Sequence, residues 1–146
     1  MRGVDTSLAD VWEGGAHAHL GMTVPGFPNL FWIYGPNTNL GGGSIVAMME
    51  AQAGYVVHAA RHLANGLLRG ERLALEVRPE AAAAYDAEMQ RRLGNSVWNS
   101  CASWYRTDGG RITANWPGTI TEYQGRTAEL ALDDFQVAAA QDGAVA

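Results

Sequence analysis

The sequence predicts an α/β fold in which strands and helices alternate in the order β-α-β-α. An apolar run at 30–34 is bounded by proline, asparagine and glycine, which is typical of a short buried strand. A glycine-rich turn at 41–43 then leads into a long segment whose apolar residues recur at helical spacing. Alternating apolar residues at 73–77, followed by Pro79, predict a second strand and a second helix.

Composition limits the classes of protein that the chain can belong to. Its 146 residues suit one domain, and 47% hydrophobic content indicates a globular protein. The formal net charge of −5 argues against nucleic acid as a partner. One cysteine, Cys101, cannot form an internal disulfide, and no apolar run reaches membrane-spanning length. We therefore expect a soluble cytoplasmic protein with no membrane partner.

The first strand, turn and helix occupy residues 30–65. We expect Leu30–Tyr34 to be the central strand of the sheet. The helix begins at Ser44, and its apolar residues recur every three or four positions. Asn65 and Gly66 supply a left-handed stop signal, so the helix should end there.

The remainder of the chain divides into three parts. The alternation at 73–77 predicts a half-buried strand, and the helix that follows should span 80–93 and end at Gly94. Short aromatic and branched runs, with a hairpin signal at 107–110, predict a strand-rich aromatic flap over 95–137. The small and polar tail at 138–146 should be disordered.

The entrance to the long helix, residues 35–44, is the first candidate for a binding site. The first N–H groups of a helix lack intrahelical partners, and a glycine-rich turn lets an anion approach them. An ordinary tight connection between a strand and a helix explains the same residues equally well.

Other candidates are weaker. His58 and His62 have the spacing of a metal-binding pair, but Ala59 stands where a His-Glu-x-x-His site needs an acid, so a solvated helix face is favoured. Cys101 has no identifiable base, and lone cysteines are mostly buried small hydrophobes. The flap aromatics could line an apolar cavity, although a satellite core is the favoured interpretation.

Several motifs, which follow one another in order, resemble the last third of flavin-dependent monooxygenases of the Baeyer–Villiger type, and the resemblance spans roughly residues 3–135. They are GMTVPGFPNLF at 21–31, YGPNTNL at 34–40, LEVRPE at 75–80, VW at 97–98, SWY at 103–105, GR at 110–111 and WPG at 116–118. A collinear series of this kind is far more specific than one motif.

The resemblance implies that residues 1–94 are the C-terminal part of a Rossmann-like FAD-binding domain, followed by the flap. It implies FAD and NADPH as cofactors of the full-length protein, which would oxygenate a small apolar ketone or a heteroatom. Five residues would approach the flavin, with the helix N-terminus facing its pyrimidine edge. They are Pro36, Asn37, Thr38, Asn39 and Leu40.

No G-x-G-x-x-G fingerprint occurs in the sequence, so the chain lacks both dinucleotide-binding motifs of that family. We expect it to form one flank of the flavin site, to be inactive alone, and to hold FAD weakly. Its uncovered apolar surface predicts a homo-oligomer. A non-catalytic ligand-binding or interaction module derived from the same fold is the alternative.

Overall fold

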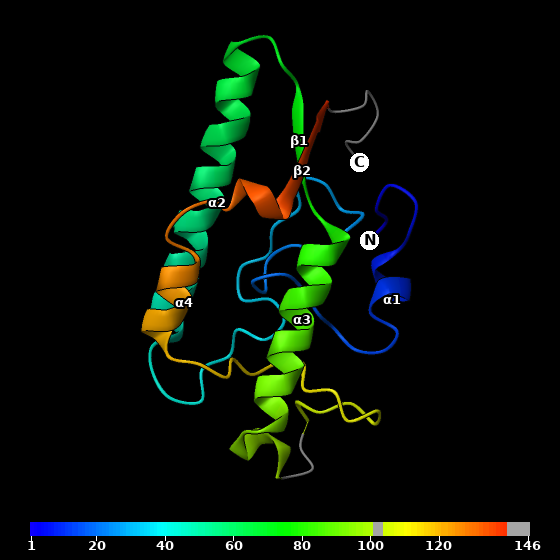
Figure 1. Ribbon diagram of the computed structural model, residues 1–146, viewed down its shortest axis with the longest axis vertical. Helices are drawn as coiled ribbons and strands as arrows, with labels where there is room; N and C mark the ends of the chain where they lie inside the picture. Colours follow the sequence, from blue (N-terminus) through cyan, green and yellow to red (C-terminus); the bar gives the residue numbers. More distant parts are fainter. Residues whose placement is uncertain (101–103, 140–146) are drawn as a thin grey trace.

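The computed structural model describes residues 1–100 and 104–139 and combines helices with a small antiparallel sheet (Figure 1). The elements in chain order are the helices α1 (Leu8–Val11) and α2 (Ile45–Leu68), the strand β1 (Leu73–Val77), the helix α3 (Pro79–Gly94), the 3-10 helix η1 (Val97–Asn99), the helix α4 (Ile120–Arg126), the 3-10 helix η2 (Leu132–Asp134) and the strand β2 (Phe135–Ala139).

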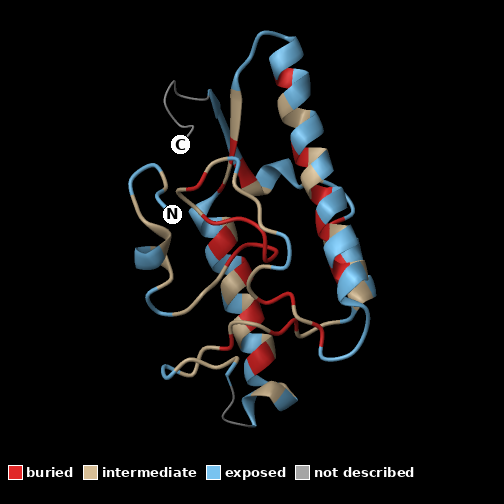
Figure 2. Cartoon of the chain, turned by 180° about the vertical axis from the view of Figure 1, so that it is seen from behind, coloured by how far each residue is buried: buried red, intermediate tan, exposed pale blue. Residues whose placement is uncertain are grey.

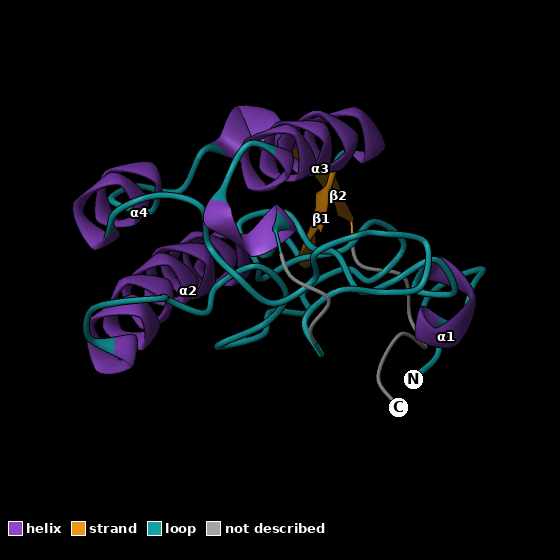
Figure 3. Cartoon of the chain, turned by 90° about the horizontal axis from the view of Figure 1, so that it is seen from below, coloured by secondary structure: helices purple, strands orange, loops and turns teal. Residues whose placement is uncertain are grey.

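The two long helices, α2 and α3, enclose a central region of irregular chain (Figures 1 and 3). The helix α4 lies against α2, while α1 lies on the far side of the molecule. The strands β1 and β2 pair antiparallel, with Leu73 opposite Ala139 and Val77 opposite Phe135. The mixed helix and strand content expected from the sequence is confirmed.

Residues 30–34 are not a strand, so the predicted β-α-β-α order is not confirmed. Asn29 and Tyr34 have left-handed φ angles of 59° and 61°, which interrupt an extended chain at both ends. The backbone N–H groups here reach separate partners. Trp32 donates to the carbonyl of Met22 at 2.9 Å, and Tyr34 donates to the side chain of Gln52 at 2.8 Å.

The long helix begins where the sequence predicts but continues past the predicted stop. Ser44 is the N-cap, and its hydroxyl accepts from the N–H of Ala47 at 3.3 Å. The end is a Schellman motif at Gly70, whose φ is +81°, and the N–H of Glu71 donates to the carbonyl of Gly66 at 2.9 Å. Gly66 is buried inside α2, where a Cβ would meet the Leu73 side chain 2.5 Å away.

The second strand and helix are confirmed as β1 and α3. The strand-rich character predicted for 95–137 is wrong, because α4 and two 3-10 helices occupy much of it. The turn at 107–110 is confirmed, and Arg106 and Ile112 form a bridge across it. Ala138 and Ala139 belong to β2, so the disordered tail does not begin at 138; residues 140–146 lie outside the described part of the chain.

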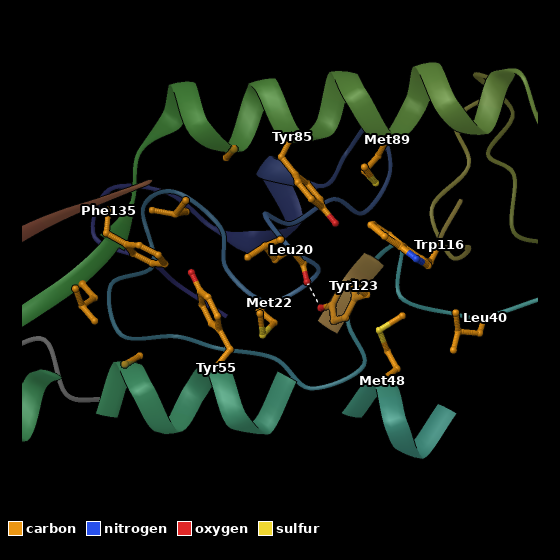
Figure 4. Close-up of a cluster of buried hydrophobic side chains, with 14 residues drawn as sticks. Leu20, Met22, Leu40, Met48, Tyr55, Tyr85, Met89, Trp116, Tyr123 and Phe135 are labelled. Carbon is orange, nitrogen blue, oxygen red and sulfur yellow. Dashed lines mark hydrogen bonds between the residues drawn. The ribbon is translucent and has the colours of Figure 1, made fainter. Parts of the chain in front are cut away.

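The main core fills the space between α2 and α3 (Figure 4). Its centre is polar as well as apolar, because fully buried Gln52 accepts from the Tyr34 N–H and donates to the Tyr123 hydroxyl at 3.0 Å. Tyr123 in turn donates to the Leu20 carbonyl at 2.6 Å. This chain of bonds, the Gln52 relay, joins α2, α4 and two irregular segments.

Four charged side chains join α3 to α4 at the edge of the core. Arg92 pairs with Glu122 at 2.5 Å, and Arg126 pairs with Glu88 at 2.6 Å. Both guanidinium groups lie over the ring of Trp116, within 5.6 Å of its centroid. Hydrogen bonds from Arg126 lower the pKa of Glu88, and hydrogen bonds from Arg92 lower the pKa of Glu122.

Replacement of Gln52 by leucine should lower the free energy of unfolding by about 1–3 kcal/mol, because the Tyr34 N–H loses its acceptor inside the protein. Urea unfolding followed by tryptophan fluorescence measures the change. Gln124 is exposed on α4, so Gln124→Leu is the control and should change stability by less than about 0.5 kcal/mol. Equal losses in the two variants would contradict the role of the relay.

The ion pairs make stability depend on acid pH. Because the folded pKa values of Glu88 and Glu122 are lowered, their contribution is complete above the unfolded glutamate value of about 4.3. It is lost as the pH falls through the lower folded values. The double variant Glu88→Gln, Glu122→Gln should therefore show a flatter fall in stability below that pH than the parent does. Exposed Glu129→Gln is the control, and an unchanged slope in the double variant would contradict the prediction.

Candidate flavin-site flank

The predicted site residues lie in a loop that is bonded to the segment 112–116 through Asn37 and Asn39. The N–H of Asn37 donates to the Thr113 carbonyl, and that of Asn39 donates to the Ala114 carbonyl, both at 2.9 Å. The carbonyl of Asn39 accepts from the N–H of Trp116 at 2.8 Å. The loop is therefore held in the manner of a short strand pair, although the strand predicted before it is absent.

Asn37 fixes the bend of the loop. It is buried, with a left-handed φ of 56° that asparagine tolerates better than most residues. Its side-chain amide donates to the carbonyls of Ile112 at 2.9 Å and Asn115 at 3.0 Å. This asparagine therefore supports the loop from its buried side and is not accessible to a ligand.

Thr38 and Leu40 are also buried. The Thr38 hydroxyl donates to the Gly35 carbonyl at 2.6 Å, which closes a tight turn. Gly21, at a φ of +67°, lies directly against Thr38, so a side chain there would clash. Leu40 packs into the main core. Three of the five predicted residues thus shape the loop from its buried side.

Pro36 and Asn39 lie at the surface of the loop. Asn39 accepts from the hydroxyl of Tyr34 at 2.8 Å and donates to the side-chain oxygen of Asn115, also at 2.8 Å. These bonds fix the orientation of the Asn39 amide.

A cleft of about 600 Å³ opens beside Pro36 and Asn39. It combines aromatic rings with backbone and amide groups. The side chain of Trp104 is 82% exposed at its rim. The lining residues are Trp12, Ala16, Tyr34, Gly35, Pro36, Thr38, Asn39, Trp104, Thr113 and Ala114. Trp12, Thr113 and Ala114 come from distant parts of the chain, and no local pattern in the sequence indicates them.

The entrance to α2 is open to solvent. Residues 41–46 are exposed, and a Cβ added at Gly42 would meet nothing within 4 Å. Gly41 differs, because a Cβ there would collide with the ring of Trp98. Gly43 has a φ of +123°, which glycine adopts readily. The helix entrance is therefore sterically open, and the N-terminal end of a helix favours an anionic group.

The weaker candidates resolve differently. Among the described residues no cluster of three metal-ligating side chains exists, and His58 and His62 are half-buried on α2. His19 is buried beside Asp134, with 3.3 Å between its Nε2 and the carboxylate, and burial lowers the pKa of the imidazole. Cys101 lies outside the described residues. Trp116 and Tyr123 belong to the main core and not to a satellite core, whereas Trp104 is exposed and lines a cleft, as the alternative interpretation has it.

Comparison with known proteins places the chain within one group. No family model matches it. It is 39% identical over 142 residues to the FAD-binding monooxygenase ktnD of Aspergillus niger, covering 96% of this chain and 23% of that protein. It is 42% identical over 145 residues to a Baeyer–Villiger monooxygenase of Streptomyces coelicolor, covering 96% of this chain and 27% of that protein.

Solved structures agree. An oxidised steroid monooxygenase bound to NADP matches with a TM-score of 0.76 and 28% identity, over 94% of this chain and 26% of that one. A closed cyclohexanone monooxygenase matches with a TM-score of 0.75 and 26% identity, over 95% of this chain and 27% of that one.

The chain is therefore homologous to a segment of FAD-binding monooxygenases. Its similarity includes monooxygenases of the Baeyer–Villiger type, as its motifs indicate. The chain spans about a quarter of the length of the relatives that it matches. Within the described residues, no helix has both the length and the apolar character needed to cross a bilayer.

Substitutions at Asn37 separate its two contributions. Asn37→Gly keeps the left-handed backbone accessible but removes two hydrogen bonds, so stability should fall by about 1–3 kcal/mol. Asn37→Ala adds the strain of a left-handed alanine and should cost about 1–2 kcal/mol more. Parallel thermal and urea unfolding of both variants measures the difference. An alanine variant as stable as the glycine variant would show that the left-handed backbone is unimportant.

Proposed function

We propose that this chain is the C-terminal portion of an FAD- and NADPH-dependent monooxygenase and supplies one flank of its flavin site. One observation carries the proposal: 96% of the chain aligns with FAD-binding and Baeyer–Villiger monooxygenases, but with only 23% and 27% of their length. A chain that aligns almost completely with about a quarter of each relative is expected to be a segment of such an enzyme.

The entrance to α2 fits the role of a flavin flank. The N-terminal end of a helix carries about half a positive charge, which stabilises an anion placed beside it. Reduced flavin is anionic at its pyrimidine edge, and bound flavin would supply the oxygen-activating chemistry of the complete enzyme. In this assignment Pro36 and Asn39 approach the flavin directly, whereas Asn37, Thr38 and Leu40 position them from the buried side.

The substrate class follows the relatives. A cyclohexanone monooxygenase that shares the fold has been crystallised with cyclohexanone bound. We therefore propose a small apolar ketone, or a compound with an oxidisable heteroatom, as the substrate of the complete enzyme. NADPH is the proposed electron donor, in keeping with the steroid monooxygenase bound to NADP. The cleft beside Pro36, with Trp104 at its rim, has apolar rings that suit such a molecule.

A chimera tests the flavin role. In it, this chain replaces the matched segment of the Streptomyces coelicolor relative, and FAD retained after gel filtration is measured by its visible absorbance. We expect the chimera to hold FAD. Gly41→Ala should lower the retained fraction, because a Cβ there collides with Trp98 and disturbs the helix entrance.

Gly42→Ala is the matched control, since a Cβ at Gly42 meets nothing, and it should retain as much FAD as the parent chimera. Folding of each chimera is checked by circular dichroism. A folded chimera without FAD, or equal retention in the two glycine variants, would overturn the proposed flavin flank.

A further inference from the structure

Helix α2 has a buried face, an exposed apolar face and an exposed polar face that carries Glu50, Arg61 and Asn65. One face is buried in the core and carries Met48, Gln52, Tyr55, Ala59 and Gly66. A second face is apolar but exposed, and we call it the α2 stripe. Its members are Val46, Met49, Ala53, Val57, Ala60, Ala64 and Leu67.

The stripe is continuous. Its residues are spaced by three or four positions throughout, so with 3.6 residues per turn they fall within an arc of about 80°, centred about 130° from the buried face. From Val46 to Leu67 the stripe is about 30 Å long at 1.5 Å per residue. Charged and amide side chains, among them Glu50, Arg61 and Asn65, lie beyond its edge.

Its larger side chains are open to solvent. The exposed fraction is 63% for Val46, 45% for Val57 and 64% for Leu67. Figure 2 shows the outer side of α2 as exposed along most of its length. A continuous apolar surface of this length on one helix is typical of an interface, not of a free surface.

We propose that the α2 stripe is the docking surface for the part of the monooxygenase fold that this chain does not contain. The inference rests on the proposed function. Relatives that match almost all of this chain are about four times as long, so about three quarters of each relative lies outside the matched segment. The occupant is an apolar, uncharged surface of that remaining fold, because the stripe offers no charge to pair with.

The position of the stripe links docking to the flavin site. Val46 lies only two residues beyond the N-cap Ser44, so a body seated on the stripe also reaches the helix entrance. The alanines at 53, 60 and 64 are small, so they allow the backbone of the docked partner to approach α2 closely. The distance between two packed helices depends on the size of the side chains at their contact. The same docked body would thus complete the site that this chain leaves open.

Cysteine labelling tests the docking surface. Ala60→Cys places a thiol at the centre of the stripe, and Asn65→Cys places one on the polar face as the matched control, both in a Cys101→Ser background. Maleimide labelling rates are measured by peptide mass spectrometry in the isolated chain and in the chimera. Sedimentation velocity of the isolated chain is recorded at the same concentration.

We expect labelling of the Ala60→Cys thiol to be slowed about tenfold or more in the chimera relative to the isolated chain, with the Asn65→Cys thiol labelled at similar rates in both. Equal Ala60→Cys labelling in the two proteins would overturn the proposal, whether or not the chimera holds FAD. Protection in an isolated chain that sediments as a dimer would overturn it in favour of a second copy. An aggregated chimera would overturn it too, because the stripe would not fit that fold.

FAD retention reports the proposed function separately. A chimera that protects the stripe but lacks FAD supports the docking surface and contradicts the flavin flank.

Discussion

Buried irregular backbone must find hydrogen-bond partners, and in this chain side chains provide many of them. Residues 18–24 are buried although they form neither a helix nor a strand of the sheet. The Gln52 relay connects the Tyr34 N–H to Tyr123 and, through it, to the Leu20 carbonyl. Elsewhere Glu76 accepts from the Gly26 N–H at 2.8 Å. These bonds allow irregular chain to fill the space between α2 and α3, where the sequence predicts a sheet. The Gln52 relay also fixes α2 relative to α4.

That constraint also determines what kind of site the chain can offer. The loop before α2 is held rigidly from below by Asn37 and by its pairing with 112–116, so its surface is preorganised. The helix entrance above it is open, and the cleft beside it is lined from three distant segments. A rigid loop beside an open helix end is suited to complete a site with another surface. The α2 stripe is similar, because both the stripe and the helix entrance are supported by this chain on one side and exposed to solvent on the other.

Local signals predict the start of α2, the strand β1 and the start of α3 correctly, but not α4 or β2. Ser44, Pro79 and the alternation at 73–77 depend on neighbouring residues, and each marked a true boundary or strand. The failures have tertiary causes. Three residues of the run at 30–34 are partly buried against the cores, whereas Ile33 and Tyr34 are exposed. The N–H groups of this run bond to Met22 and Gln52 instead of a strand ladder. Gly66 is small because Leu73 lies against it, and not because the helix ends there. The loop at 36–40 is predicted from its glycine-rich context and its motif, whereas only the fold brings Trp12 and Thr113 to the cleft beside it.

We infer that this chain forms one flank of a flavin site and needs further protein to complete it. A titration of the isolated, monomeric chain with FAD, followed by flavin fluorescence, tests it most directly. We expect no saturable binding up to about 100 μM FAD, because one helix end and one loop offer few of the contacts that tight binding needs. Saturable binding to the monomer well below that concentration would contradict the claim and would mean that a complete flavin site exists within these 146 residues.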